Sequence, residues 1–554
     1  MQLVTHQLAG LFPRVAHRPA VTSPGRGHRA AFAWRSGPGQ WAPLGALVFV
    51  VAVACRIAVL EHDHGLKGNS GYDASVYFAA ADALTHGRLP YRDFTLLHPP
   101  GMMLALSPFG WLTRLVPDPT AFMVTNLAIT LVGAACAVLV VQICRRLGLG
   151  RGPALVGGLF YATWFGAVGA EYHAKLEPVG NLLLLSAVLV ALGGQRNDRP
   201  WRSRAAGVLL GLALTVKIWW IVPVLGVLLW HGLTTRAARP AARMAAGAAG
   251  AAVLVCLPFF VLAPRRMWQS VILDQLGRGR MRGPLTRVAD LSTLTRLGGQ
   301  VPSGALLAGC VVAALLLVVA AVGAWRCRLG RPAVILLAAQ LVVLFAAPSW
   351  FPFYADYVAG ALSITVAAGA AWPVLRGRRL PRGVVAWLPT GAAAAVTVLV
   401  LATRPAAAPP APGLARLSEA VAGTRCVMSD SPMGLIEVDA LSRGLAHGCP
   451  NWVDVTGRTY GPDKVPGRSR PVNPRWQADL RTYLRSGGAV LIVRRGGTGI
   501  APRTQAAISH NGVLARADGR TIYRVTHRSA PGGDVEPRRA VLGLGRARPD
   551  VDPR

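Results

Sequence analysis

Residues 303–325 read SGALLAGCVVAALLLVVAAVGAW, an apolar run that contains no charged side chain. A helix of this length is long enough to cross the hydrocarbon core of a bilayer. The basic segment RCRLGR follows at 326–331, and similar apolar runs alternate with arginine clusters between residues 43 and 402. This alternation is typical of a protein that crosses the membrane many times.

The composition of the whole chain supports the same interpretation. Of the 554 residues, 53% are hydrophobic and 15% are charged, and the mean hydropathy is +0.41. Soluble domains carry about 25% charged residues, so an ordinary cytosolic enzyme, a secreted disulfide scaffold and a disordered chain are excluded. The net charge of +35 would suit a nucleic-acid partner. Many of the arginines lie between apolar runs, however, so we expect no such partner.

The apolar runs predict an all-α polytopic membrane protein with about eleven transmembrane helices in a domain at 43–403. The expected spans are 43–60, 121–144, 153–169, 178–194, 205–216, 218–232, 244–262, 303–325, 332–348, 357–375 and 383–402. If residues 1–42 form a basic cytoplasmic tail, the inner segments carry many arginines and a single acidic residue, Asp198. The outer segments then carry basic and acidic residues in similar numbers. The positive-inside rule therefore predicts a cytoplasmic N-terminus and an extracytoplasmic C-terminus in the cell membrane.

Two apolar segments do not fit a simple span. Residues 99–116 are short and interrupted by proline, so we expect a surface or re-entrant helix within the first outer loop, 61–120. Residues 205–232 are expected to form two short helices that meet at Lys217, because a single span would place the arginines that follow on the outer side.

The composition changes after the last apolar run. Residues 404–413, RPAAAPPAPG, predict a Pro/Ala linker. Helical and strand patterns over 414–526 indicate a small extracytoplasmic α/β domain, and 527–554 are expected to be a disordered tail. Cys426 and Cys449 both lie in the α/β domain, where a disulfide is stable outside the cytoplasm. The sequence leaves open whether they form one.

The first outer loop concentrates polar residues in GYDASVYFAAADALTHGRLPYRDFTLLHPPG (71–101). Asp73 stands at the start of a helical pattern, where it is either the N-cap or a functional carboxylate. Asp82, in the middle of that helix, is expected to be solvated. Arg92 and Asp93 form either a salt-bridged turn or part of a site.

A second polar cluster is AEYHAKLEP (170–178), which places Glu171, His173, Lys175 and Glu177 between two apolar runs. Four ionisable side chains at the edge of a bilayer indicate either a polar cavity or a plain hairpin loop. The spacing of Glu171 and His173 does not suit a helical metal pair, and the chain has no zinc spacing and no phosphate-binding loop. We therefore assign no metal site, and the need for a divalent cation stays open.

Basic and aromatic residues mark three further positions. Lys217, in TVKIWW, lies at a membrane boundary and either snorkels to the interface or holds a lipid phosphate. The third outer loop contains QLGRGRMRGPLTR, in which Arg278 and Arg280 indicate anion binding, because topology does not explain a basic outer loop. SWFPFYADY, which includes Tyr354, is either an aromatic belt or a sugar-stacking rim.

In their order along the chain, these segments resemble the GT-C superfamily of polyprenyl-phosphate-sugar-dependent glycosyltransferases. The resemblance is specifically to the protein-mannosyltransferase-like and aminoarabinose-transferase-like branch. The resemblance covers about residues 43–402 and rests on the Asp-x3-Tyr helix at 73–77, the GRLPYRDF…HPP run and GLALTVK. It implies transfer of a sugar, with inversion, from a polyprenyl-phosphate-linked donor among membrane lipids to an acceptor hydroxyl on a glycan, lipid or protein. A polytopic transporter or lipid-linked-sugar flippase is the alternative, although we find no internal repeat.

The resemblance also assigns roles to residues. It implies that Asp73 is the general base and that Asp93, a second polar position, is also a catalytic candidate. Lys217 is expected near the lipid phosphate, and Glu177, which opens a span, is a further binding candidate. Asp356 precedes a tyrosine in a motif where the family often carries histidine or arginine, which puts a catalytic role for that loop in doubt. The remaining candidates for binding substrate or lipid phosphate are Arg278, Arg280, Arg92, His98, Glu171, His173 and Tyr354.

Overall fold

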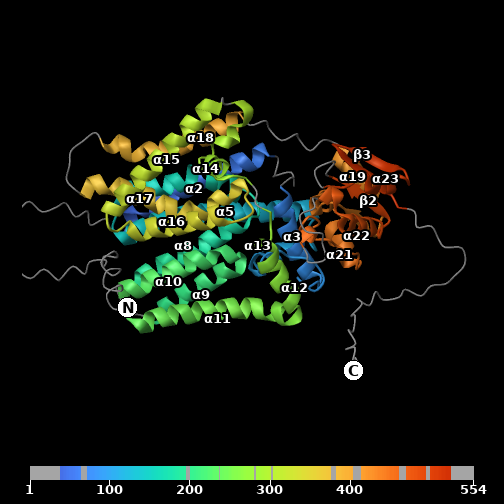
Figure 1. The fold of residues 1–554 in the computed structure, drawn as a ribbon, viewed down its shortest axis with the longest axis horizontal. Helices are drawn as coiled ribbons and strands as arrows, with labels where there is room; N and C mark the ends of the chain where they lie inside the picture. Colours follow the sequence, from blue (N-terminus) through green and yellow to red (C-terminus); the bar gives the residue numbers. More distant parts are fainter. Residues whose placement is uncertain are drawn as a thin grey trace, which may run out of the picture.

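The computed structural model describes residues 38–63, 71–194, 200–235, 237–279, 282–300, 303–375, 382–403, 413–460, 470–493 and 499–525. The expectations for most of the N-terminal tail, for the linker up to residue 412, for the C-terminal tail and for Arg280 fall outside these residues. The described chain forms a long helical bundle with a small α/β domain at one end (Figure 1).

Apolar helices make up the bundle. They are α2 (Ala42–His62), α5 (Asp118–Leu147), α6 (Arg151–Thr163), α7 (Phe165–Glu171), α8 (Leu176–Gly194), α9 (Pro200–Val216), α10 (Ile221–Thr235), α11 (Ala238–Leu262), α15 (Ser303–Arg326), α16 (Arg331–Ala346), α17 (Ala359–Leu375) and α18 (Arg382–Thr403). Among the described residues, 8 helices are long and apolar enough to cross a membrane, or 9 if α6 and α7, bent by 51°, form one span. The expected spans at α9 and α16 give helices of only 17 and 16 residues. The multi-pass helical fold is therefore confirmed, but the count of eleven is not.

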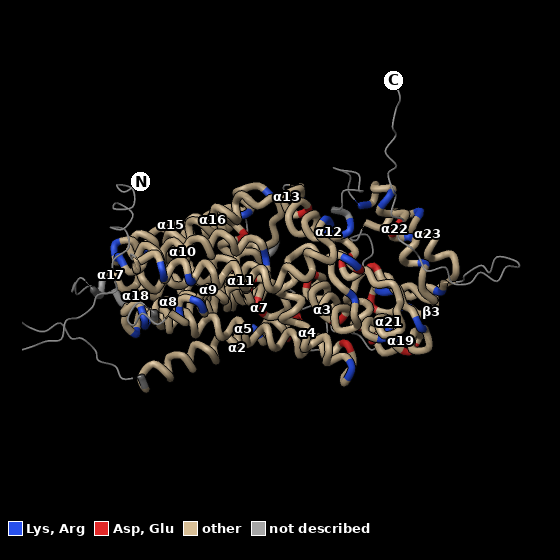
Figure 2. Tube along the Cα trace, turned by 90° about the horizontal axis from the view of Figure 1, so that it is seen from below, with Lys and Arg blue, Asp and Glu red and all other residues tan. Residues whose placement is uncertain are grey.

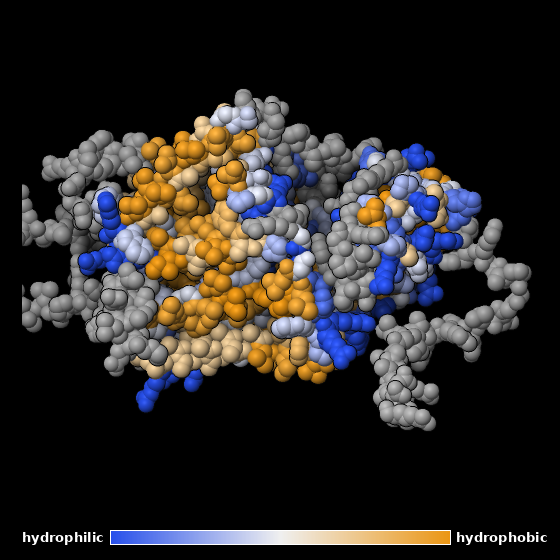
Figure 3. Space-filling model, in the orientation of Figure 1, coloured by the Kyte–Doolittle hydropathy of each residue, from blue (hydrophilic) through white to orange (hydrophobic). Residues whose placement is uncertain are grey.

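The surface of the bundle is apolar and its ends are charged. In Figure 2, Lys and Arg lie at the end of the bundle away from the C-terminal domain and also on that domain, while most Asp and Glu lie toward the domain. Figure 3 shows hydrophobic side chains over the bundle between these two regions. Leu254 and Val261 of α11 are 76% and 68% exposed. An apolar belt between two polar ends fits a lipid bilayer.

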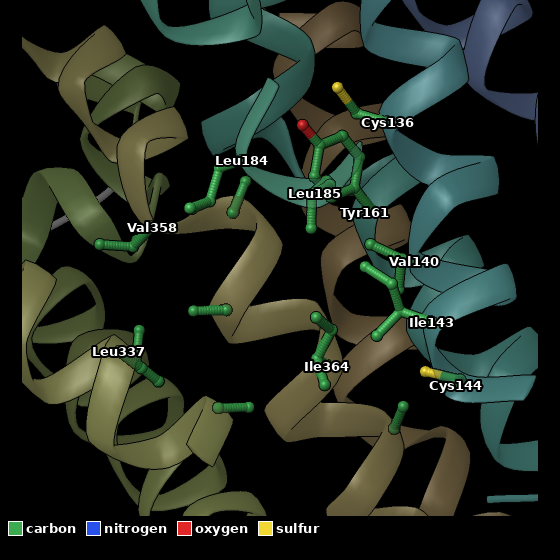
Figure 4. Packing of buried hydrophobic residues seen from close by; sticks show 14 of the residues in the cluster. Cys136, Val140, Ile143, Cys144, Tyr161, Leu184, Leu185, Leu337, Val358 and Ile364 are labelled. Carbon is green, nitrogen blue, oxygen red and sulfur yellow. The ribbon is translucent and has the colours of Figure 1, made fainter. Parts of the chain in front are cut away.

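The centre of the bundle is filled by aliphatic side chains from several helices. In Figure 4, Val140 and Ile143 of α5 face Ile364 of α17, and Leu184 of α8 lies on the other side of the same helix. All four side chains are at most 7% exposed.

Two glycines of α9 allow α11 to approach closely. A Cβ added at Gly207 would lie 2.1 Å from the carbonyl oxygen of Met244, and one at Gly211 would lie 2.2 Å from that of Ala248. The Gly-x3-Gly spacing is the one that brings membrane helices into backbone contact.

The break expected within residues 205–232 is present. α9 ends at Val216, Lys217 has an extended backbone with φ −155°, and one 3-10 turn, Ile218–Trp220, leads into α10. The break leaves the Lys217 side chain between two helices rather than on the face of one.

Short helices form an outer layer between the bundle and the C-terminal domain (Figure 1). They are α3 (Tyr72–Thr85), α4 (Gly101–Leu112), α12 (Pro264–Trp268) and α13 (Asp274–Leu276). Two further short helices pack against the bundle itself, α14 (Pro284–Leu291) against α15 and the 3-10 helix η6 (Pro352–Val358) against α7. α4 is the apolar segment expected as a surface or re-entrant helix, and its 12 residues are too few to span a bilayer. The expectation that Asp82 is solvated is wrong, because α4 and its following turn cover it. Its side chain is buried, and Thr113 Oγ1 donates to Asp82 Oδ1 at 3.0 Å.

The C-terminal domain is a four-stranded sheet with short helices around it. Its elements are α19 (Gly413–Val421), β1 (Val427–Ser429), α20 (Pro432–Glu437), α21 (Leu441–Ala446), α22 (Pro474–Leu484), β2 (Ala489–Ile492), α23 (Pro502–Ser509), β3 (Val513–Ala517) and β4 (Arg520–Arg524). The strand order is β1-β2-β4-β3, and only β1 and β2 pair in parallel. β1, β2 and β4 are the strands expected from the sequence. β3 is an additional strand, joined to β4 by a tight turn in which Asp518 and Gly519 have φ of 51° and 74°. Cys426 and Cys449 form a disulfide.

Hydrogen bonds between α5 and the α20–α21 turn join the domain to the bundle. The Asp118 N–H donates to Asp439 Oδ1 at 2.8 Å, and Asp118 Oδ2 accepts from the Leu441 N–H at 2.9 Å. These reciprocal bonds fix the domain against the first turn of α5.

Candidate active site

A cavity of about 90 Å³ lies where the outer layer meets the C-terminal domain. The charged and imidazole side chains in its wall are Asp73, His98, Glu177, Lys217, Arg278 and Asp454. They come from distant parts of the chain, which the fold brings together. A larger cavity of about 130 Å³ lies between α5, α8, α10 and α16, but mostly apolar side chains line it. The polar cavity is therefore the candidate active site.

Asp73 lies in the first turn of α3, where the helix dipole favours a carboxylate. Gly71 is the N-cap, so Asp73 is not the cap. The Asp73 side chain is 37% exposed and accepts a hydrogen bond from Lys175 Nζ at 2.7 Å. Burial raises the pKa of the Asp73 carboxyl, but Lys175, Arg278 and Lys217 lower it more, so its pKa lies below the ordinary value. Asp73 is thus ionised at neutral pH and able to accept a proton.

Lys217 points into the cavity. Its Nζ donates to Glu177 Oε1 at 2.8 Å and lies 3.7 Å from the ring centroid of Trp219 and 3.9 Å from that of Tyr354. The side chains of Lys217 and Glu177 are only 3% and 2% exposed. Snorkelling to the membrane interface is therefore excluded for Lys217. The ion pair and the two aromatic faces hold a positive charge at a fixed place in the wall.

His98 and Arg278 lie near Lys217. Burial, and then the charges of Lys217 and Arg278, lower the pKa of His98 well below its ordinary value. His98 is therefore neutral at pH 7, while Lys217 and Arg278 bring positive charge to the cavity wall. Two cations of this kind suit a phosphate group.

Aromatic rings close one side of the cavity. Tyr354 of η6 packs edge-on against Trp219 at 4.7 Å and against Phe353 at 5.0 Å. Tyr354 and Trp350 are only 5% and 1% exposed. The interpretation of this segment as a lipid-facing aromatic belt is therefore wrong, because its rings pack inside the protein beside the cavity.

Two of the residues expected in the site lie within the bundle instead. Arg56 donates through Nε to Glu171 Oε2 at 2.9 Å, and Tyr161 Oη donates to Glu171 Oε1 at 2.7 Å. His173 is buried against the Tyr172 ring at 4.0 Å. Neither Glu171 nor His173 lines the cavity.

Arg92 and Asp93 form the salt-bridged turn that the sequence allows. Arg92 Nε donates to Asp93 Oδ1 at 2.9 Å, and the Leu89 N–H donates to Asp93 Oδ2 at 2.7 Å. Both residues are exposed, and neither lines the cavity. Asp356 also lies outside it, since it is buried and accepts a hydrogen bond from Asn181 Nδ2 at 3.1 Å.

The C-terminal domain contributes cavity residues that the sequence does not indicate. Asp454 and Thr456 line the cavity, and Asp454 Oδ1 accepts a hydrogen bond from Tyr72 Oη at 2.9 Å. Asp454 and Tyr72 lie 382 positions apart in the chain. Short motifs carry no signal for a contact over that separation.

Within the described ranges, no group of three or more His, Cys, Asp or Glu side chains is placed to hold a metal ion. The carboxylates of the cavity wall are instead paired with Lys175, Lys217 and Tyr72.

Comparisons with known proteins agree with this architecture. Residues 96–350 match the model of glycosyltransferase family 87. ArnT from Cupriavidus metallidurans, solved with undecaprenyl phosphate, is similar to this chain with a TM-score of 0.53 and 15% identity, over 90% of this chain and 100% of that one. The archaeal oligosaccharyltransferase AglB from Archaeoglobus fulgidus, solved with an inhibitory peptide and a dolichol-phosphate, is similar with a TM-score of 0.50 and 13% identity, over 81% of this chain and 69% of that one. No curated protein sequence matches.

These likenesses confirm the resemblance to the GT-C superfamily at the level of the fold. Together with the family match, they support a multi-pass membrane glycosyltransferase.

Proposed function

We propose that this GT-C-fold glycosyltransferase moves a sugar from a polyprenyl-phosphate donor to an acceptor hydroxyl at the outer face of the membrane. The observation that carries the proposal is the position of the ionised Asp73 in the same cavity as Lys217 and Arg278. A base and two cations beside an apolar bundle suit a hydroxyl acceptor and a lipid-linked phosphate.

The reaction requires a proton transfer and a displacement. Asp73 takes the proton of the acceptor hydroxyl as its oxygen attacks the anomeric carbon, a role worth about 10²–10⁴ in rate. The bond from the anomeric carbon to the phosphate oxygen breaks, and its electron pair leaves with the polyprenyl phosphate. Lys217 and Arg278 stabilise the charge that develops on this phosphate. A single displacement of this kind inverts the anomeric centre.

Lys175 positions Asp73 for this role. Its ion pair offsets the effect of burial on the Asp73 carboxyl, so the base is ionised before the acceptor binds. The donor already carries a phosphate leaving group, so the reaction needs no nucleotide pocket.

The arginine distribution supports an extracytoplasmic cavity. Figure 2 places many Lys and Arg at the bundle end away from the C-terminal domain. By the positive-inside rule that end is cytoplasmic, so the cavity and the domain lie outside. The undecaprenyl phosphate bound by ArnT is a donor carrier of the type we propose for this chain.

The candidates outside the cavity receive structural roles in this proposal. Arg92 and Asp93 hold the exposed turn before His98, and Glu171 joins α7 to α2 through Arg56. His173 packs in the same buried region.

A reconstituted transfer assay tests the proposal. The full chain in nanodiscs is incubated with radiolabelled polyprenyl-phosphate sugars and a membrane extract as the source of acceptor. We expect label in a new glycoside, with one free polyprenyl phosphate released for each sugar transferred. If label instead crosses the bilayer of proteoliposomes while still attached to its lipid, the chain is a flippase and the proposal is wrong.

A further inference from the structure

Asp454 is a carboxylate of the cavity to which the reaction above gives no role. It belongs to the segment 449–458 of the C-terminal domain, CPNWVDVTGR. Asp454 lines the same cavity as Asp73, so a group from outside the helical bundle reaches the candidate active site.

The hydrogen bonds of Asp454 converge on one of its oxygens. Oδ1 accepts from Tyr72 Oη at 2.9 Å, from Thr456 Oγ1 at 3.1 Å and from the Gly457 N–H at 2.8 Å. Within the part of the chain that the structure describes, no donor reaches Oδ2. A carboxylate fixed through one oxygen has its second oxygen available to a ligand hydroxyl.

The segment around Asp454 is held from both sides. The Cys426–Cys449 disulfide anchors its first residue, and the Thr456 N–H donates to Tyr72 Oη at 3.0 Å. Gly457 packs so closely that a Cβ there would lie 2.3 Å from Asp454 Oδ2. The carboxylate therefore sits in a rigid wall rather than on a mobile loop.

The cavity carries charges of both signs. Lys175 pairs with Asp73 and Lys217 pairs with Glu177, whereas the three groups that donate to Asp454 are uncharged. Within the described residues, no cation forms an ion pair with Asp454. Lys217 and Arg278 supply positive charge elsewhere in the wall of the same cavity.

We propose that Asp454 binds the acceptor, and that the acceptor is a neutral saccharide. A hydroxyl of the saccharide donates to Asp454 Oδ2, which brings a neighbouring hydroxyl to Asp73. The Asp454 carboxylate, which has no ion pair among the described residues, repels an anionic acceptor, whereas Lys217 and Arg278 bind the donor phosphate. This inference rests on the proposed function, and it makes the C-terminal domain part of the acceptor site.

The test separates acceptor binding from donor binding. Asp454→Asn preserves the size of the side chain and the acceptor atom at Oδ1 but replaces Oδ2 with an amide nitrogen. Wild type and variant are assayed with octyl glycosides of mannose, arabinose and glucose as neutral acceptors and with octyl glucuronide as an anionic one. The binding of undecaprenyl phosphate to each protein is measured directly, because this lipid probes the donor part of the site. The matched control is Asp430→Asn, a buried carboxylate of the same domain that accepts from the Val493 N–H at 2.8 Å outside the cavity.

We expect Asp454→Asn to raise the KM for the neutral acceptors about ten- to hundredfold. The ratio of transfer to neutral glycosides over transfer to octyl glucuronide should fall. Undecaprenyl phosphate binding should be unchanged, and Asp430→Asn should leave the acceptor KM unchanged. An unchanged acceptor KM in Asp454→Asn, or an equal loss of donor binding, would overturn the inference. Wild-type transfer to the membrane extract but to no neutral glycoside would overturn the saccharide class alone. Absence of both transfer and undecaprenyl phosphate binding would instead overturn the proposed function.

Discussion

Lys175 Nζ lies 2.7 Å from Asp73 Oδ2, although 102 residues separate the two in the chain. The contact joins the segment before α8 to the first turn of α3. The Lys175 ammonium also lies 3.8 Å from the centroid of the Phe353 ring. Because Lys175 lowers the pKa of Asp73, replacing Lys175 should change the pH at which Asp73 loses its charge.

Lys175→Met should move the pH dependence of transfer. In the wild type, Lys175 helps to hold the pKa of Asp73 below its ordinary value, so the base stays ionised well into the acidic range. Without Lys175, the effect of burial raises that pKa. The acidic limb of the pH–rate profile is then expected at higher pH in the variant. Lys175→Arg keeps the charge and should keep the limb near its wild-type position. A limb that does not move in Lys175→Met would show that Lys175 does not control the base.

Lys217→Met should weaken donor binding. A lost charge-assisted contact to the phosphate costs about 1.5–3 kcal/mol, or about ten- to hundredfold in Kd for undecaprenyl phosphate. The substitution also leaves Glu177 buried without its cation, which destabilises the fold. The double variant Lys217→Met/Glu177→Gln removes that buried charge and should recover stability without recovering affinity. Wild-type affinity in the double variant would remove Lys217 from the phosphate site.

Gly207→Val should destabilise the contact between α9 and α11. The new side chain has no room beside the Met244 carbonyl oxygen, and overpacking of this kind costs about 1–3 kcal/mol. Thermal unfolding in detergent measures the effect as a lower Tm. Gly250→Val is the matched control on α11, because nothing lies within 4 Å of its added Cβ. Equal Tm values for the two variants would contradict the close approach of these helices.

Reduction of the Cys426–Cys449 disulfide should loosen the acceptor side of the cavity. The bond closes a loop with a sequence separation of 23, for which about 3 kcal/mol of stabilisation is expected. In the Cys426→Ser/Cys449→Ser variant, the C-terminal domain should be less stable. The backbone amides of β1 and β2 should therefore exchange hydrogen faster than in the wild type. The same exchange rates with and without the bond would argue against a structural role.

The sequence predicts best those features that local patterns determine. The predicted helix break at Lys217 follows from the length of the apolar run and from the arginines after it, which the positive-inside rule keeps on the inner side. Asp73 begins a helical pattern in a polar outer loop, and in the structure its side chain lines the cavity.

Contacts between distant segments could not be predicted. His98 and Asp93 lie in one loop, but only the turn geometry determines that His98 faces the cavity while Asp93 faces solvent. The burial of Glu171 depends on Arg56 from another helix. Asp454 reaches the site through the docking of a separate domain, which no local motif encodes.

The most direct test of the account compares two aspartates of the first outer loop. Asp73→Asn and Asp93→Asn are purified in nanodiscs and assayed for sugar transfer from a polyprenyl-phosphate donor, with undecaprenyl phosphate binding as a measure of folding. Asp73→Asn should bind the lipid normally but lose about 10²–10⁴ in transfer rate, because it lacks the base. Asp93→Asn should keep most of its activity, because its carboxylate lies in an exposed turn outside the cavity. Equal transfer by Asp73→Asn and the wild type would contradict the central claim that Asp73 is the general base.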